Sequence, residues 1–189
     1  MLAPVSEHSL EFNKSISDIS FGYLQKSLVL SDKVEQWNVY NVYRIPREIH
    51  SLFQTSFKSS KYWHFNSLLL SGLTTFADDE NTMRLYFYPD KFTVLLLKGK
   101  QLLQVQTYFY HVPEDVAFYL LSSCKLHELH PDEVKVIIAG LIEADSALYH
   151  ELGRYFLQLH WAESSSNKDS FGEYPAHYFS PIVDMSVCV

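Results

Sequence analysis

Two histidines three residues apart are the first side chains of this sequence that could do chemistry. His127 and His130 lie close to the acidic pair Asp132-Glu133, and imidazole and carboxylate groups are common ligands of transition metals. The stretch KLHELHPDE, however, spans the predicted end of a helix, where Pro131 follows. Histidines at a helix C-terminus interact favourably with the helix dipole. We therefore predict a solvated helix terminus here and no metal site, with a metal-dependent enzyme as the weaker alternative.

Glycine-containing signatures of phosphate binding or nucleophilic catalysis are missing from the sequence. The six glycines are scattered, so neither a P-loop nor a G-x-G-x-x-G pattern occurs, and no G-x-S-x-G elbow is present. The acidic run Ala77–Asn81 offers few converging oxygens for a cation, and we interpret it as a solvated turn. The common classes of nucleotide-binding and hydrolytic site are therefore not predicted.

Composition is that of a globular protein with a net negative charge. The 189 residues are 47% hydrophobic and 20% charged, which suffices for a core without metals or disulfides. Aromatic residues reach 15%, but a net charge of −7 argues against a nucleic-acid partner. Only two cysteines occur, Cys124 and Cys188, and no apolar run reaches the length of a membrane span. We expect a cytoplasmic protein with no secretory signal and no membrane span.

The elements that would position functional residues begin after a polar stretch. Residues 1–20 are predicted to be an irregular lead-in, and Phe21–Leu30 fits either a strand or a short helix. Trp37–Ile45 alternates between two faces and predicts a strand. Pro46 suits the first position of a following helix. The apolar stripe of that helix is Ile49, Leu52, Phe53 and Phe57.

Three strands joined by short turns follow a second predicted helix, Tyr62–Ser71. The strands are Met83–Tyr88, Phe92–Leu97 and Gln101–Tyr110. Turns as short as Pro89-Asp90 require antiparallel neighbours. The middle strand is apolar on nearly both faces, as expected of a central strand that is covered on both sides.

Helices and strands alternate in the remaining sequence. We predict a helix over Pro113–Leu126, a strand over Val134–Ala139, a helix over Ala144–Tyr155 and a strand over Phe156–Trp161. Residues 175–189 turn apolar again, and we expect them to return to the core. The order β-β-β-α-β-α-β is a mixed α+β or α/β fold, and it is similar to one half of the ribonuclease H and actin superfold. The later strands should be parallel neighbours because crossovers are right-handed.

The block Gln106–Phe156 has an aromatic strand before Glu114-Asp115 and a lone Gly140 after an apolar strand. In these features it resembles the signature region of a bacterial family of uncharacterised proteins, domain of unknown function 3822. The motifs NVYRIP at Asn41–Pro46 and PAHYFSP at Pro175–Pro181 fit as well. Members of that family resemble actin-like ATPases of the PilM type. The resemblance therefore implies an actin-like ATPase (ribonuclease H-like) fold.

The resemblance also implies a domain organisation. Residues 1–36 would be a polar lead-in and a partial first lobe, 37–80 the remainder of the first actin-like half, and 81–189 the second half. Chains of the family are longer than this one and have a further strand-hairpin region ahead of it. We therefore expect the fold to be incomplete at its N-terminus.

Asp90 and Gly140 are the cofactor-binding residues that the resemblance implies. The second phosphate hairpin of an actin-like ATPase would align with Leu85–Phe92, which contains no glycine, and Pro89 there lacks an N–H donor. Asp90 is either a metal-associated acid or, as we favour, an ordinary turn residue. Gly140 is either a remnant of an adenosine-side glycine pair or, as we favour, a tight strand-to-helix turn.

These residues favour a catalytically silent interaction or scaffold protein with no catalytic residues and no bound cofactor. The alternative is a nucleotide-binding actin-like ATPase, with ATP and Mg²⁺, whose first phosphate hairpin is missing from this chain. A protein partner or a homodimer formed by strand addition at an exposed sheet edge would fit the first hypothesis.

Overall fold

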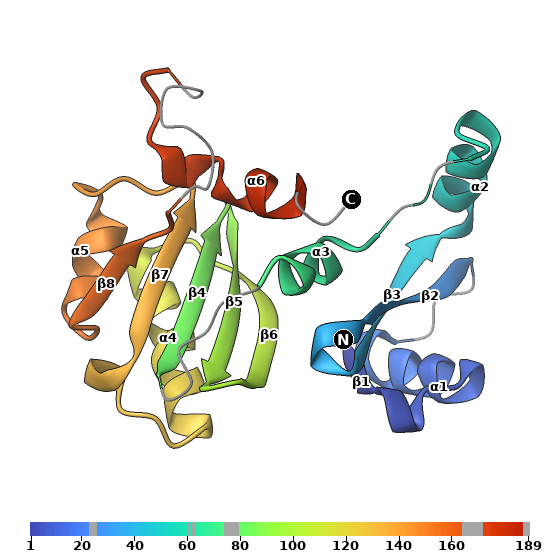
Figure 1. Ribbon diagram of the computed structural model, residues 1–189, viewed down its shortest axis with the longest axis horizontal. Coiled ribbons are helices and arrows are strands. Elements are labelled where there is room, and N and C mark those ends of the chain that lie inside the picture. The colour runs from blue at the N-terminus through green and yellow to red at the C-terminus, as the bar shows by residue number, and fades with distance from the viewer. Residues whose placement is uncertain (23–25, 60, 62, 74–79, 164–171, 187–189) are drawn as a thin grey trace. The chain divides into compact units, whose positions relative to one another are not determined.

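The structure is a computed structural model that describes residues 1–22, 26–59, 61, 63–73, 80–163 and 172–186. Figure 1 shows the chain passing through one small β-sheet and then through a larger one. Helices of described residues contact both sheets. Among those helices, none is long and apolar enough to cross a membrane.

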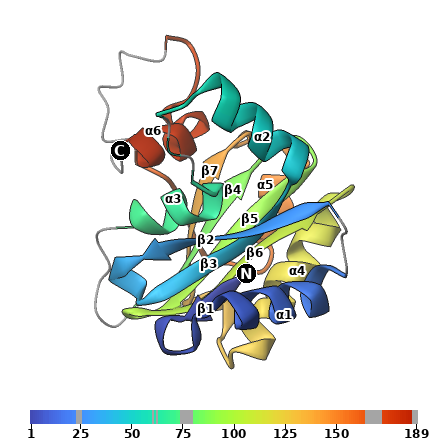
Figure 2. The ribbon, with the colours of Figure 1, turned by 90° about the vertical axis from the view of Figure 1, so that its right-hand side faces the viewer.

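The first sheet is antiparallel and has the strand order β1-β3-β2 (Figure 2). The elements around it, in chain order, are β1 (Leu2–Pro4), the 3₁₀ turn η1 (Val5–Glu7), α1 (Leu10–Phe21), β2 (Ser27–Val34), the 3₁₀ turn η2 (Glu35–Trp37), β3 (Val39–Pro46), α2 (Arg47–Ser56) and α3 (Phe65–Ser71). Helix α1 packs against β2 and β3.

The prediction of an irregular lead-in over residues 1–20 is wrong. Ser9 caps a twelve-residue helix, α1, by accepting a hydrogen bond from the Phe12 N–H at 3.0 Å. The face that α1 buries carries Asn13 and Ser17, which are almost completely inaccessible to solvent. Because these buried residues are polar, the apolar periodicity that reveals a helix is absent from the sequence.

The predicted strand and helix around Pro46 are present with shifted ends. Asn38 adopts a left-handed conformation (φ 50°) after η2, so β3 begins only at Val39. Pro46 is the last residue of β3 and the N-cap of α2 rather than its first residue. The four side chains of the predicted apolar stripe are exposed, by 44, 61, 42 and 58%: Ile49, Leu52 and Phe53 on α2, and Phe57 at its C-cap.

The second sheet is mixed and has the strand order β6-β5-β4-β7-β8. The elements that form and cover it are β4 (Asn81–Phe87), β5 (Lys91–Lys98), β6 (Gln101–Phe109), α4 (Pro113–Leu126), the 3₁₀ turn η3 (Pro131–Glu133), β7 (Lys135–Gly140), α5 (Ala147–Gly153), β8 (Gln158–Trp161), the 3₁₀ turn η5 (Ala176–Tyr178) and α6 (Ser180–Ser186). β4, β5 and β6 are antiparallel, whereas β7 is parallel to both β4 and β8. The predicted β-β-β-α-β-α-β order is confirmed.

The core of this unit is formed by the interior strands β5, β4 and β7 and by the helices that pack on them. Every residue from Phe92 to Leu97 on β5 is buried, which confirms the prediction of a strand covered on both faces. The predicted apolar stripe of α4 is buried in the same core: Val116, Leu120 and Cys124. Helix α5 is shorter than predicted, because the Ser146 hydroxyl caps it by accepting from the Tyr149 N–H at 3.2 Å.

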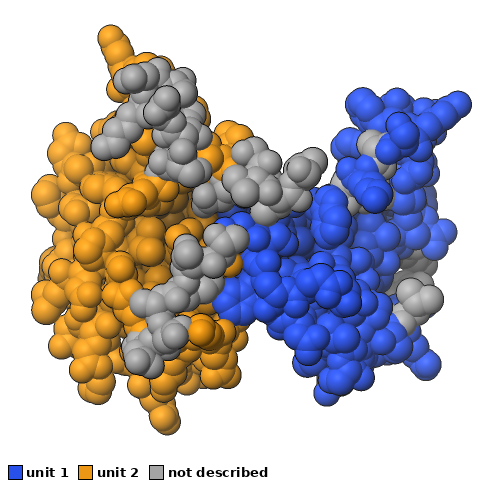
Figure 3. Space-filling model, viewed as in Figure 1, with its two compact units in different colours: residues 1–72 blue, residues 73–189 orange. Residues whose placement is uncertain are grey.

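The chain divides by its internal contacts into two compact units, Met1–Gly72 and Leu73–Val189 (Figure 3). Each unit contains one of the two sheets. The interpretation of residues 1–36, 37–80 and 81–189 as parts of two actin-like halves stays a prediction.

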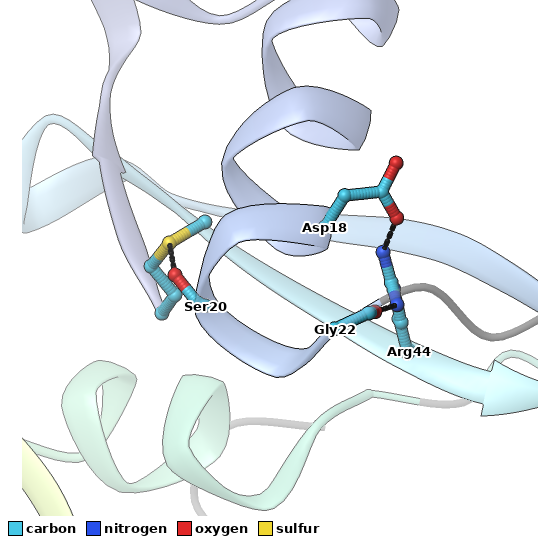
Figure 4. A network of polar contacts seen from close by, with 5 residues as sticks. Asp18, Ser20, Gly22 and Arg44 are labelled. Atoms are coloured by element: carbon cyan, nitrogen blue, oxygen red, sulfur yellow. Dashed lines mark hydrogen bonds and ion pairs between the residues drawn. The ribbon is translucent and has the colours of Figure 1, made fainter.

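A polar contact fixes the end of α1 in the first unit (Figure 4). The Arg44 guanidinium on β3 bonds to the Asp18 carboxylate and to the Gly22 carbonyl, at the C-terminus of the helix. A cation there interacts favourably with the unpaired carbonyls of the last helical turn. This contact therefore ties α1 to the strand on which it packs.

Candidate functional site

The carboxyl ends of β4 and β7 form the edge where this fold could hold a ligand. The two strands are parallel neighbours in a register that pairs Phe87 with Gly140. Pro89-Asp90 follows β4 after one residue, Tyr88, so both residues predicted to bind a cofactor, Asp90 and Gly140, lie at this edge. In open α/β sheets, ligands bind outside the carboxyl ends of parallel strands.

Gly140 is in close contact with the backbone of β4. Its φ angle is +88°, and an added Cβ would lie 2.2 Å from the Phe87 carbonyl oxygen. The next amide, Leu141 N–H, donates to the same Phe87 carbonyl at 3.0 Å. Only glycine fits this position, because any side chain would collide with main-chain atoms that cannot move aside. The contact supports a structural reason for Gly140, a tight turn after β7.

The Pro89-Asp90 turn is closed by main-chain hydrogen bonds. Tyr88 N–H donates to the Lys91 carbonyl at 2.9 Å across the hairpin between β4 and β5. Tyr110 N–H donates to the Asp90 carbonyl at 3.2 Å, and the Tyr110 hydroxyl donates to the Tyr88 carbonyl at 3.3 Å. The Asp90 side chain itself is exposed. Tyr110, the residue after β6, therefore supports the main chain of the turn and leaves the Asp90 carboxylate in solvent.

Two tyrosines beside this turn have raised pKa values. Burial raises the pKa of the Tyr88 hydroxyl, and the neighbouring Tyr86 adds to the rise. Burial likewise raises the pKa of Tyr110, and the Asp90 carboxylate adds to the rise because it disfavours a second negative charge. Both hydroxyls therefore stay protonated at neutral pH and do not act as bases.

The two histidines of the KLHELHPDE stretch lie at the end of α4, as their sequence indicates. His127 is the C-cap of that helix, and His130 is the N-cap of η3. Glu128 between them adopts a left-handed conformation (φ 55°), and the Leu129 N–H closes the helix end on the Cys124 carbonyl at 2.9 Å. Within the described ranges, no three His, Cys, Asp or Glu side chains come together in a metal-binding arrangement.

Residues 172–186, which we name the C-terminal cap, contact the carboxyl edge beside Gly140. Figure 1 shows α6 at the end of the sheet toward which β4 and β7 run. The His177 ring stacks on Trp161 at 4.1 Å between centroids and donates through Nε2 to the Ile142 carbonyl at 2.9 Å. The Tyr178 hydroxyl donates to the Glu143 carboxylate at 3.1 Å. The loop after Gly140 is therefore occupied by the chain's own residues.

A family model of an uncharacterised protein family matches most of the sequence. The model is described as Protein of unknown function (DUF3822), and it matches residues 1–159. This chain belongs to the DUF3822 family. The resemblance of Gln106–Phe156 to that family is thereby confirmed.

A solved structure shows which fold this DUF3822 chain has. It is similar to a Bacteroides thetaiotaomicron protein described as having an actin-like ATPase fold and unknown function, with a TM-score of 0.78 and 15% identity. The match covers 88% of this chain and 66% of that one, so the chain spans just under two thirds of that protein's length. The predicted actin-like ATPase fold, with a mixed five-stranded sheet, is confirmed.

A second solved structure matches this DUF3822 chain more weakly. It is described as an AlfA filament bound to AMPPNP, with a TM-score of 0.40 and 15% identity over 59% of this chain and 39% of that one. A likeness this weak supports no conclusion about this chain. No curated protein matches the sequence.

Trp161 and His177 were not predicted as site residues of the DUF3822 chain. Sixteen positions separate them in the sequence, and neither belongs to a chemical motif. The stretch PAHYFSP, which contains His177, lies beyond residues 1–159 that the family model matches, so its place in a family motif stays a prediction. The pairing itself depends on the tertiary fold, which brings the cap back to β8.

Proposed function

We propose that this DUF3822 protein is a catalytically silent interaction protein built on an actin-like ATPase fold. The observation that carries the proposal is that main-chain N–H groups at the carboxyl edge of β4 and β7 already donate hydrogen bonds within the protein. Leu141 N–H and Tyr88 N–H already donate to protein carbonyls, at 3.0 and 2.9 Å, and Pro89 has no N–H. Phosphate binding needs amides that point at the ligand. At this edge those donors are used within the fold.

The C-terminal cap supports the same proposal. It places the His177 ring on Trp161 and against the Ile142 carbonyl, two residues after Gly140. A ligand that approached the loop after Gly140 would have to displace these contacts. These contacts and the hydrogen-bonded amides of Tyr88 and Leu141 therefore oppose nucleotide binding at this edge.

Helix α2 supplies a surface on which an interaction protein could bind a partner. Ile49 and Leu52 expose 44% and 61% of their surface, and they lie one helical turn apart on the predicted apolar stripe. Adjacent exposed apolar side chains are typical of contacts with other proteins. This surface supports a binding role without naming the partner.

Titration calorimetry with ATP and Mg²⁺ tests the proposal. We expect no binding heat at micromolar protein, with a functional actin-like ATPase as positive control. Micromolar binding that depends on Mg²⁺ would contradict the proposal and support the alternative, a nucleotide-binding ATPase. The observation that favours this alternative is that Asp90 and Gly140 share one sheet edge. In that case Asp90→Asn would weaken binding only in the presence of Mg²⁺.

A further inference from the structure

Helix α2 carries apolar side chains that do not enter the core of the first unit. No residue of this ten-residue helix is buried, and Ile49, Leu52 and Phe53 expose 44, 61 and 42% of their surface. Phe57 at the C-cap is 58% exposed, and its ring centroid lies 6.1 Å from that of Phe53. An amphipathic helix of a globular protein normally turns such a stripe toward a core. A stripe that stays exposed marks a contact with a protein or with a membrane.

Basic side chains flank this stripe on both sides in the sequence. Arg47 lies in the first turn of α2, Lys58 and Lys61 follow the helix, and all three are exposed. Glu48 is the single acidic residue between positions 47 and 61. The segment is therefore positively charged, whereas the whole chain has a net charge of −7. An occupant that complements this segment combines apolar groups with negative charge.

A second copy of this chain does not fit that description. Pairing two α2 stripes would bring the same basic side chains together, and juxtaposed like charges oppose association. A bilayer with anionic lipids has both features in one surface, acyl chains and headgroup phosphates. Three exposed aromatic rings, those of Phe53, Phe57 and Trp63, also suit the boundary between these two layers. Charge and side-chain type together therefore favour a lipid surface.

We propose that α2 binds the surface of a membrane that contains anionic lipids. Its apolar stripe enters the boundary of the acyl layer, and Arg47, Lys58 and Lys61 contact the headgroup phosphates. Ten residues make about 15 Å of helix, so α2 lies along the surface and does not cross a hydrocarbon core of about 30 Å. The proposal rests on the binding role of α2 in the proposed function and gives that role a partner.

Flotation of the full-length protein with lipid vesicles tests the proposal. One set of vesicles contains equal parts of phosphatidylglycerol and phosphatidylcholine, and the other contains phosphatidylcholine alone. We expect the protein to float with the anionic vesicles and to stay in the dense fraction with the neutral ones. Binding should weaken as salt is added, because the Debye length falls from about 10 Å at 0.1 M salt.

A pair of lysine substitutions tests the electrostatic part of the contact. Lys58→Gln/Lys61→Gln should lower the affinity for anionic vesicles about tenfold or more, because each basic residue near such a surface contributes about fivefold. Lys98→Gln/Lys100→Gln is the matched control, because it removes the same charge from exposed positions at the turn between β5 and β6. The control should bind like the original protein.

Leu52→Gln tests the apolar part of the contact. Glutamine keeps a high helix propensity, and Leu52 is 61% exposed, so the helix should remain folded. We expect the affinity for anionic vesicles to fall about tenfold or more, because the leucine side chain no longer leaves water. Ile19→Gln is the control: Ile19 is 84% exposed on α1, which Figures 1 and 2 show well apart from α2. Equal affinities of the two variants would overturn the proposal.

Two further results separate this proposal from the proposed function. If the original protein does not float with either kind of vesicle, or floats equally with both, the proposal fails and a protein becomes the partner for α2. Calorimetry of the lipid-free protein with ATP and Mg²⁺ reports on catalytic silence alone. Nucleotide binding there would contradict the proposed function, whatever the vesicles show about α2.

Discussion

Gly140 is the single residue whose conformation the fold constrains most clearly. Its positive φ and the 2.2 Å approach of an added Cβ to the Phe87 carbonyl make Gly140→Ala incompatible with the native pairing of β4 and β7. We expect the substitution to lower the free energy of unfolding by at least about 2 kcal/mol, measured by urea denaturation. Gly153→Ala is the matched control, because an added Cβ at Gly153 would have its nearest neighbour at an ordinary 3.9 Å. Equal stability of the two variants would refute this account of Gly140.

His64 should make the stability of the first unit depend on pH. Burial is the largest cause of its lowered pKa. The N-terminal ammonium group lowers the pKa further, and the Asp32 carboxylate partly opposes the shift. Its Nδ1 accepts the Asn66 N–H at 3.1 Å as the N-cap of α3, which requires a neutral ring. The unfolded chain therefore binds a proton at a higher pH than the folded chain does. Stability is fully present above about pH 6.5 and falls as the pH drops from there through the lowered pKa.

His64→Asn is the variant that checks the pH prediction. Asparagine is a good N-cap residue and does not titrate. We expect thermal unfolding at a series of pH values to show a smaller loss of stability below pH about 6.5 for the variant than for the original protein. Parallel pH profiles of the two proteins would show that the His64 ring does not contribute.

At the scale of the elements, a buried polar network joins α3 to β2 and β3. The Asp32 carboxylate accepts three hydrogen bonds: from the Tyr43 hydroxyl at 3.0 Å, and from the His64 N–H and the Ser67 hydroxyl, both at 2.7 Å. Asp32 is 8% exposed and Ser67 is fully buried. These contacts connect the strands to a helix that lies more than thirty residues further along the chain.

Asp32→Ala should destabilise this unit strongly. The substitution leaves three donors without their acceptor, and two of them belong to residues with little or no access to solvent, Tyr43 and Ser67. We expect a loss of about 3 kcal/mol or more in chemical denaturation. Lys33→Ala is the control, because its ion pair with Glu35 is exposed and contributes little. A loss for Asp32→Ala no larger than for the control would contradict the proposed role of the network.

At the scale of the whole molecule, the predicted homodimer would form by strand addition at β6, the edge strand of the larger sheet. Its nine residues, Gln101–Phe109, contain no charged residue and no proline, the devices that commonly protect edge strands. We expect the mass from static light scattering to rise with concentration toward a dimer. Gln106→Lys, an exposed position on β6, should lower that mass, whereas Ser122→Lys on α4 should not. A constant monomer mass for the original protein would contradict strand addition.

The sequence by itself determined the mixed fold of residues 81–163. Short turns specify antiparallel neighbours, and the almost entirely apolar run Phe92–Leu97 specifies an interior strand of the sheet, because both signals are local. The absence of glycine from the Pro89-Asp90 turn was also evident in the sequence. Helix α1, in contrast, escaped prediction because its buried Asn13 and Ser17 hide the apolar period.

Only the tertiary structure decided what surrounds the candidate site. It showed that Gly140 lies against the Phe87 carbonyl rather than in open space, and that the cap brings His177 onto Trp161. These contacts join residues far apart in the chain, through parallel strand pairing and the return of the C-terminal segment. Local patterns of residue type carry no record of such pairings, because they depend on how complete elements pack.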